Sequence, residues 1–203
     1  PDILPEFTSR YPNVEIRITD MNSKRLEQLI LNGDLDLAIV ISGGEHPSIE
    51  EKPLMSDQIY LCAADTLLRK YYGDGTEDLK RKARNMADVK DFSRLPFCIL
   101  NNRMGQNIQK CFDEAGFVPN IYTTSAYVQI STSIGLKGLA ACFATRNSIL
   151  NQKGEISEDI NVFPLYCKGE PLLQQISVIH HKERYLSSYT QYFQELILKY
   201  FHE

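Results

Sequence analysis

The sequence has no surplus of basic residues: 22 Lys and Arg stand against 26 Asp and Glu, which gives a formal net charge of -4. A protein that binds nucleic acid through its own surface needs clustered positive charge to neutralise phosphates. The composition therefore predicts that any contact with DNA comes from a part of the protein outside this sequence.

Motifs for common enzyme chemistries are missing too. There is no Gly-x-Ser-x-Gly nucleophile motif, no phosphate-binding loop and no dinucleotide fingerprint. His180 and His181 are adjacent in a predicted strand, so their rings face opposite ways and cannot easily hold one metal. Asp34 and Asp36 share one side of their segment and do not flank a substrate as a glycosidase pair does. The sequence offers no catalytic set, and we expect no metal and no cofactor.

The sequence also lacks a Cys-x-x-Cys motif, a signal-peptide pattern and any apolar run near the roughly 20 residues that span a bilayer. Its cysteines are odd in number, far apart and mostly within apolar runs: Cys62, Cys98, Cys111, Cys142 and Cys167. This usage is typical of buried, reduced thiols. We therefore expect a cytoplasmic protein without a membrane partner.

The first 44 residues have the pattern of a β-α-β unit. Residues 14–19 alternate apolar and polar, which predicts a strand, and Ser23 is suited to cap a helix that ends at Gly33. Residues 35–41 are almost continuously apolar, which predicts a parallel strand covered on both faces. That strand leads into Ser42-Gly43-Gly44, where the glycines are equally well explained as a simple loop hinge.

Short polar side chains follow four predicted strands, at Ser42, Asn101, Thr124 and Thr145. Ligands of open α/β sheets bind beyond the carboxyl ends of the strands. Four such ends suit a polar pocket for one small molecule. Arg103 lies at a predicted helix start and could hold a small anion there, although Asn102 or Gln106 could equally be a plain helix cap.

Residues 65–94 are charged, contain glycine and are only partly periodic, which predicts a surface insertion with one short helix. The basic run of Lys80, Arg81, Lys82 and Arg84 could touch an anionic partner, but a solvated face is the commoner explanation. Helical spacing of apolar residues from Leu186 to Tyr200 predicts a long closing helix.

The segments "LPEFTSRYPNVEIRIT" and "SKRLEQLILNGDLDLAIV" resemble the effector-binding domain of LysR-type transcriptional regulators, which shows Phe-x-x-x-Tyr-Pro, a strand, a helix and then Gly-x-Leu-Asp-Leu-Ala-Ile. "KPLMSDQIYLCA", "FDEAGFVP" and "GLKGLAACFA" are similar to further family segments. The resemblance covers Pro1 to about Ser148 and the closing helix.

The resemblance implies an α/β fold of two Rossmann-like lobes joined by two crossovers, similar to type II periplasmic-binding proteins, with an effector cleft between the lobes. It assigns residues 1–56 and 183–203 to lobe I, without the family's first strand, and residues 57–182 to lobe II, with the insertion at about 65–94. Matching residues to the family's effector contacts gives this set: Ser23, Ile41, Ser42, Asn102, Arg103, Met104, Thr124 and Ser125.

The resemblance also implies a homodimer or homotetramer, in which the helix of residues 23–32 packs against the helix of residues 126–137 of another subunit. DNA would be bound only through a winged helix-turn-helix that is absent from this sequence. The expected function is sensing of a polar or anionic small-molecule effector, which modulates DNA binding and transcription by the full-length protein. The alternative is a solute-binding protein of a transporter, which would carry a leader peptide, and an enzyme built on the same two lobes comes third.

Overall fold

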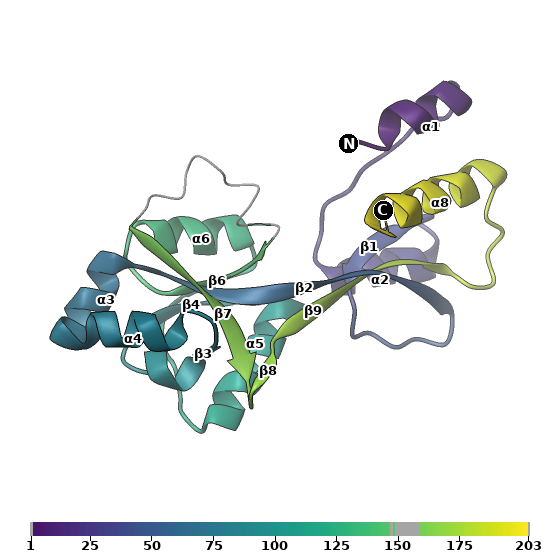
Figure 1. The fold of residues 1–203 in the computed structure, drawn as a ribbon. Coiled ribbons are helices and arrows are strands. Elements are labelled where there is room, and N and C mark those ends of the chain that lie inside the picture. Colours follow the sequence, from purple (N-terminus) through teal and green to yellow (C-terminus); the bar gives the residue numbers. More distant parts are fainter. Residues whose placement is uncertain (1, 147, 149–158, 203) are drawn as a thin grey trace. The chain divides into compact units, whose positions relative to one another are not determined.

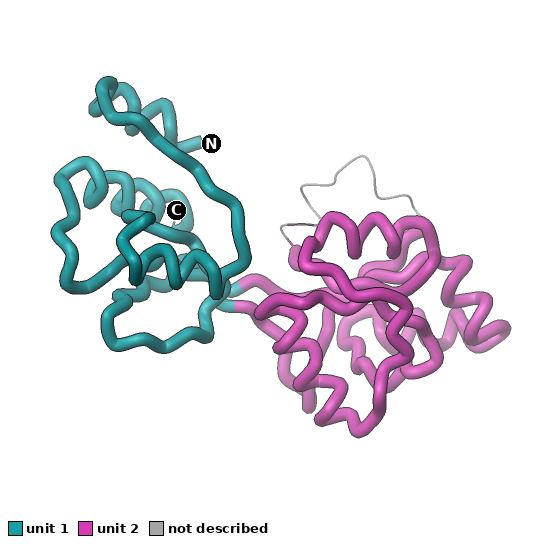
Figure 2. The backbone as a smooth tube through the Cα atoms, turned by 180° about the vertical axis from the view of Figure 1, so that it is seen from behind, with its two compact units in different colours: residues 1–56, 175–203 teal, residues 57–174 magenta. Residues whose placement is uncertain are grey.

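The computed structural model describes residues 2–146, 148 and 159–202. The chain forms two compact units, and Figure 2 colours them separately: Pro1–Ser56 with Gln175–Glu203 (unit 1), and Asp57–Gln174 (unit 2). The chain passes from one unit to the other inside strands β2 (Ile49–Ala64) and β9 (Leu173–His181). The second passage therefore lies earlier in the sequence than the boundary after residue 182 that the family resemblance implies.

Unit 1 is a small sheet with a helix on each face. Strand β1 (Ala38–Ile41) pairs antiparallel with β9, and Ala38 lies opposite Ile179. Neighbouring residues of β9 face opposite ways. Ile179 packs in a cluster with residues of helix α2 (Ser23–Asn32), while Val178 packs with residues of helix α8 (Ser188–His202). Helix α1 (Leu4–Arg10) lies beside α8 (Figure 1), and the ring of its Phe7 packs edge-on against that of Phe193 in α8.

Two predictions for this unit are wrong. Residues 14–19 form no strand, and Ile18 is 80% exposed. An alternating pattern allows an extended conformation, but a strand also needs a paired neighbour, and no described strand pairs with this segment. The strand within residues 35–41 is antiparallel rather than parallel, and its Ile39 is 45% exposed. An apolar run does not fix strand direction, because direction depends on which neighbour pairs with it.

Unit 2 contains the remaining part of β2 and a larger set of elements. They are α3 (Asp65–Tyr72), η1 (Gly73–Gly75), α4 (Thr76–Ala83), β3 (Ala87–Asp88), η2 (Val89–Phe92), β4 (Pro96–Leu100), α5 (Arg103–Ala115), β5 (Asn120–Ser125), α6 (Val128–Leu136), β6 (Cys142–Thr145), β7 (Ile160–Cys167) and β8 (Glu170–Pro171). Strand β2 pairs antiparallel with β6 and β7, and β4 pairs parallel with β5. Strand β6, which leads to Thr145 as predicted, is buried at every residue.

Residues 65–94 are more ordered than the single short helix that we predicted. They form α3, α4 and two 3-10 turns, and their apolar side chains, such as Leu68 and Phe92, lie in the core of unit 2. The basic run pairs with acids: Lys80 with Asp65, Arg81 with Asp78, and Lys82 with Asp91. This pairing favours a solvated face over an anion-binding surface.

Candidate functional site

Ser23 links the start of α2 to the end of β1. The predicted cap is wrong by one residue, because the side chain of Asn22 accepts the hydrogen bond from the Arg25 amide, at 3.0 Å. The hydroxyl of Ser23 instead accepts a hydrogen bond from the Ile41 amide, also at 3.0 Å. Two predicted site residues are thus brought together, and the hydroxyl hydrogen of Ser23 is donated to no described residue.

Ser42 follows β1 directly and is held by β9. Its amide donates to the carbonyl of Gln175 at 2.9 Å, and its hydroxyl oxygen lies 2.7 Å from that of Ser177. Ser177 is only 1% exposed. Sequence reasoning missed Ser177 because it is 135 positions from Ser42, and its one signal was a lone serine between apolar residues of a predicted strand.

In unit 2, Asn102 caps α5. Its side-chain oxygen accepts from the Gly105 amide at 3.0 Å, and its side-chain nitrogen lies 3.4 Å from the Ala126 carbonyl. A side chain at Gly105 would collide with the Leu100 carbonyl, so this helix start approaches the end of β4 as only glycine allows. The plain capping role that we kept open for Asn102 is confirmed.

The ends of β4 and β5 are joined, which brings the two predicted loops of unit 2 together. The amide of Asn101 donates to the carbonyl of Ser125 at 2.7 Å. The hydroxyl of Ser125 accepts from the Tyr127 amide at 3.1 Å, whereas α6 itself begins after Tyr127 with no side-chain cap. The side chains of Ser125 and Asn102 therefore both form hydrogen bonds with nearby backbone groups.

The other three candidates of the set in unit 2 differ in exposure. Met104 is 1% exposed, so its side chain belongs to the core. Arg103 is the first residue of α5 and is partly buried. Thr124 is exposed, and its hydroxyl makes no hydrogen bond with any described residue. Thr124 is therefore the hydroxyl in this loop pair that is available to a ligand.

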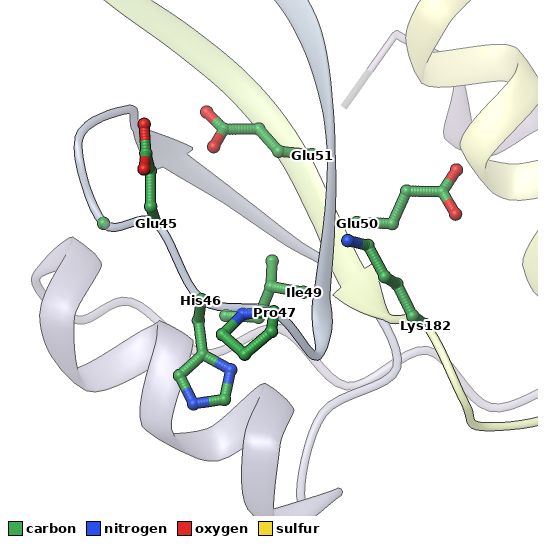
Figure 3. Close-up of a pocket in the computed structure, with 8 residues that line it drawn as sticks. Glu45, His46, Pro47, Ile49, Glu50, Glu51 and Lys182 are labelled. Carbon is green, nitrogen blue, oxygen red and sulfur yellow. The ribbon is translucent and has the colours of Figure 1, made fainter.

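A pocket of 690 Å³ in unit 1 contains none of the predicted site residues. It follows Ser42 along the chain and is lined by Gly44, Glu45, His46, Pro47, Ile49, Glu50, Glu51 and Lys182. Figure 3 shows the carboxylates of Glu45, Glu50 and Glu51 pointing in different directions rather than converging. Among the described residues, no group of three His, Cys, Asp or Glu side chains is arranged to hold a metal ion.

A smaller pocket of 150 Å³ in unit 2 contains two of the cysteines. The Cys167 thiol donates to Glu114 at 2.8 Å, and burial raises the pKa of both Cys111 and Cys167. A raised pKa keeps a thiol protonated and unreactive. All five cysteines are free thiols, as predicted, although Cys167 is only partly buried. No helix within the described ranges is long and apolar enough to cross a membrane.

Comparison with known proteins places this geometry in a family. Residues 1–202 match the family model described as the LysR substrate binding domain. An uncharacterized HTH-type transcriptional regulator of Bacillus subtilis, YcgK, is 24% identical over 204 residues, which cover 97% of this chain and 61% of that protein. The chain thus spans about three fifths of the length of this relative.

Two solved structures share the fold. The regulatory domain of Synechocystis PCC6803 CcmR, in complex with 2-PG, has a TM-score of 0.79 and 15% identity, with 99% of this chain and 90% of that chain covered. The effector-binding domain of QuiR, in complex with shikimate, has a TM-score of 0.77 and 17% identity, with 100% and 90% covered. The α/β architecture of the two units and the match over residues 1–202 show that the chain belongs to the LysR substrate binding domain family.

Proposed function

We propose that this chain is the small-molecule effector-sensing domain of a LysR-type transcriptional regulator that acts in the bacterial cytoplasm. The family match over residues 1–202 is the observation that carries the proposal. The Bacillus relative is a helix-turn-helix regulator, and the CcmR and QuiR domains are complexes with small molecules. These relatives favour a regulator over the solute-binding protein of a transporter.

The contacts that we propose for the effector fall into two groups. Ser23 and Ser42 donate hydroxyl hydrogens at the end of β1, with the backbone at Ile41 held between them. In unit 2, Thr124 donates its hydroxyl and Arg103 attracts an anionic group, because charge-assisted hydrogen bonds are the strongest that a guanidinium makes. Asn102, Met104 and Ser125 shape this part of the site, since their side chains are occupied by capping or packing.

Signal transfer requires only that the effector bind two arrangements of the protein with different affinity. A coupling free energy of about 1 to 3 kcal/mol is typical of such systems. We propose that this coupling alters the attached DNA-binding part, which lies outside this sequence. The mechanism needs no catalytic step and no cofactor.

We also propose that the protein acts as a homodimer or homotetramer. Two large apolar side chains at the N-terminal end of α6, Tyr127 and Ile130, are more than half exposed and lie three residues apart. Residues at this spacing lie on one face of a helix, and exposed apolar side chains on one face are typical of a protein interface. Replacing Ile130 with glutamate should shift the full-length protein toward monomer in analytical ultracentrifugation, and an unchanged mass would contradict this interface.

A reporter assay with the full-length regulator tests the proposed function. Cells carrying the regulator and its own promoter fused to a reporter are given a panel of carboxylic acids, sugar acids and amino acids. The proposal predicts that at least one compound changes reporter output, and that Ser42→Ala and Thr124→Ala reduce the response. If the regulator controls the promoter and no compound of any class alters its output, effector sensing is wrong.

A further inference from the structure

We infer that Ser177 is a positioning residue that fixes the direction of the Ser42 hydroxyl, so that the end of β1 recognises a carboxylate or another oxyanion. The inference rests on the proposed function, because it names the ligand chemistry of the same site. It adds a residue that is not among the candidate contacts and assigns a direction to the hydrogen bond between two hydroxyl groups.

The burial of Ser177 sets this direction. Ser177 is 1% exposed, and the Ser42 hydroxyl, at 2.7 Å, is the one partner of its side chain among the described residues. A buried hydroxyl hydrogen without an acceptor is costly, because it has lost its hydrogen bond to water. If Ser42 donated the bond between the two hydroxyls, the hydroxyl hydrogen of Ser177 would be buried without an acceptor. Ser177 must therefore donate, and Ser42 accepts.

Ser42 then has its own hydrogen to give. It is only partly buried, so this hydrogen can reach water or a ligand. The backbone of Ser42 is held in place, because its amide donates a hydrogen bond to the Gln175 carbonyl at 2.9 Å. The side chain and the backbone are both held by β9, and the hydroxyl hydrogen is the group left over.

The hydroxyl of Ser23 also accepts a hydrogen bond from the protein and keeps its own hydrogen. Its oxygen already accepts from the Ile41 amide at 3.0 Å, and its hydrogen is donated to no described residue. The end of β1 is thus flanked by two hydroxyl groups that each accept from the protein and each have one hydrogen to donate. An oxyanion accepts hydrogens of this kind on each of its oxygens and brings none of its own, whereas an amide offers one uncharged oxygen acceptor and an ammonium group offers none.

The electrostatic setting agrees with an anion. Helix α2 is ten residues long and begins at Ser23, and its first turn carries no acidic side chain. The partial positive charge of a helix start is therefore not neutralised by the helix itself. The charge at the helix start supports the argument from the two hydroxyl groups, which carries the inference.

The direction of the hydrogen bond can be observed directly. Neutron diffraction from crystals of the deuterium-exchanged protein should show the deuterium of Ser177 on the line toward the Ser42 oxygen. The deuterium of Ser42 should point away from Ser177. A deuterium on Ser42 directed at Ser177 would overturn the inference, and this result does not depend on any ligand.

The ligand chemistry is tested by calorimetry on the full-length protein with benzoate, shikimate and their primary amides. We expect an acid to bind more tightly than its amide. Ser177→Ala should weaken binding of the acid about fivefold and reduce the ratio of acid to amide affinity, because the Ser42 hydroxyl is then free to rotate. Ser177→Cys, which keeps a weak donor, should retain part of the ratio.

The control is Ser48→Ala in the same unit, whose hydroxyl bonds to no described residue, and it should leave both affinities unchanged. An unchanged ratio in Ser177→Ala, or amides that bind better than acids, would contradict the inference. If no compound of any class alters reporter output in the assay above, the proposed function fails, while the deuterium position at Ser177 still decides the direction of the bond.

Discussion

The amide of Ile41 donates a 3.0 Å hydrogen bond to the hydroxyl of Ser23, and this bond ties the first residue of α2 to the last residue of β1. The relationship joins a structural role to the proposed binding role, because the same hydroxyl keeps its hydrogen for a ligand. Its contribution to stability can be measured separately from its contribution to binding.

Ser23→Ala should lower the free energy of unfolding by about 1 kcal/mol, because the partly buried Ile41 amide loses its acceptor. Urea denaturation followed by circular dichroism gives this value. Ser9→Ala is the matched control, since Ser9 is an exposed helical serine whose hydroxyl bonds to no described residue. Equal stability of the two variants would show that the bond does not hold α2 in place.

Thr124→Ala should leave stability within about 0.5 kcal/mol of wild type, because the Thr124 side chain is exposed and unbonded among the described residues. Effector binding should nevertheless weaken. Calorimetric titration beside a denaturation curve separates the two quantities. A variant with full affinity would remove Thr124 from the proposed site.

Asn102→Ala should destabilise the protein by about 1 kcal/mol through loss of the α5 cap, whose oxygen accepts from the Gly105 amide. The neighbouring Asn101→Ala is the control, because Asn101 uses its backbone amide rather than its side chain. The difference between the two urea midpoints measures the cap. No difference would mean that another group satisfies the Gly105 amide.

Gly33→Ala should lower the free energy of unfolding more than Gly116→Ala does. Both glycines end helices with left-handed φ angles, of 80° and 74°. Each alanine has a backbone cost of about 1 kcal/mol. At Gly33 the new methyl group would also displace Arg184, whose guanidinium donates to the Asn32 carbonyl at 2.7 Å, whereas the space around Gly116 is open.

The double variant Gly33→Ala with Arg184→Ala separates these two costs. The Arg184→Ala background removes the three atoms nearest to the new methyl group, so Gly33→Ala should there lower the free energy of unfolding no more than Gly116→Ala does. Thermal or urea unfolding of wild type, the three single variants and the double variant provides the measurement. Equal costs of Gly33→Ala in both backgrounds would rule out a role for the Arg184 contact.

Asp65 predicts how stability changes in acid. Hydrogen bonds from Lys80 and then Arg69 lower the pKa of Asp65 from its ordinary 3.8 to about 2. Because the folded-state pKa is depressed, the stabilisation is fully present above pH 3.8 and is lost as pH falls from 3.8 toward 2. Asp65→Asn should lower the free energy of unfolding by about 1 kcal/mol at pH 7, since the group forms a partly exposed network.

The control for this prediction is Asp74→Asn, since Asp74 is exposed and makes no ion pair within the described residues. Urea denaturation at pH 7 and near pH 2.5 should show that the difference between wild type and Asp65→Asn shrinks in acid. A difference that stays constant with pH would contradict the ion-pair account of Asp65.

Features with a local cause were predictable from the sequence. Gly33 ends its helix in the left-handed conformation, as its position predicted, and a strand does lead to Thr145. Polar residues at strand ends were also recognisable, and Asn101 and Ser125 do lie together. These features depend on neighbours in sequence, which is the information that periodicity and capping patterns contain.

Features that depend on distant partners were not predictable. The direction of β1 is set by β9, and the hydroxyl of Ser23 bonds to Ile41, 18 positions away, rather than to its own helix. Ser177 sits in an apolar strand where a lone serine gave no reason to pair it with Ser42. Residues 14–19 had a strand pattern, but a pattern does not provide a pairing partner.

The central claim is that the chain binds a small-molecule effector through these hydroxyl groups. Calorimetric titration of the full-length protein with the compound that changes reporter output, repeated with Ser42→Ala and Ser48→Ala, tests it most directly. The account predicts that Ser42→Ala weakens binding about fivefold or more while Ser48→Ala binds as wild type does. Identical affinities for all three proteins would show that the effector binds elsewhere.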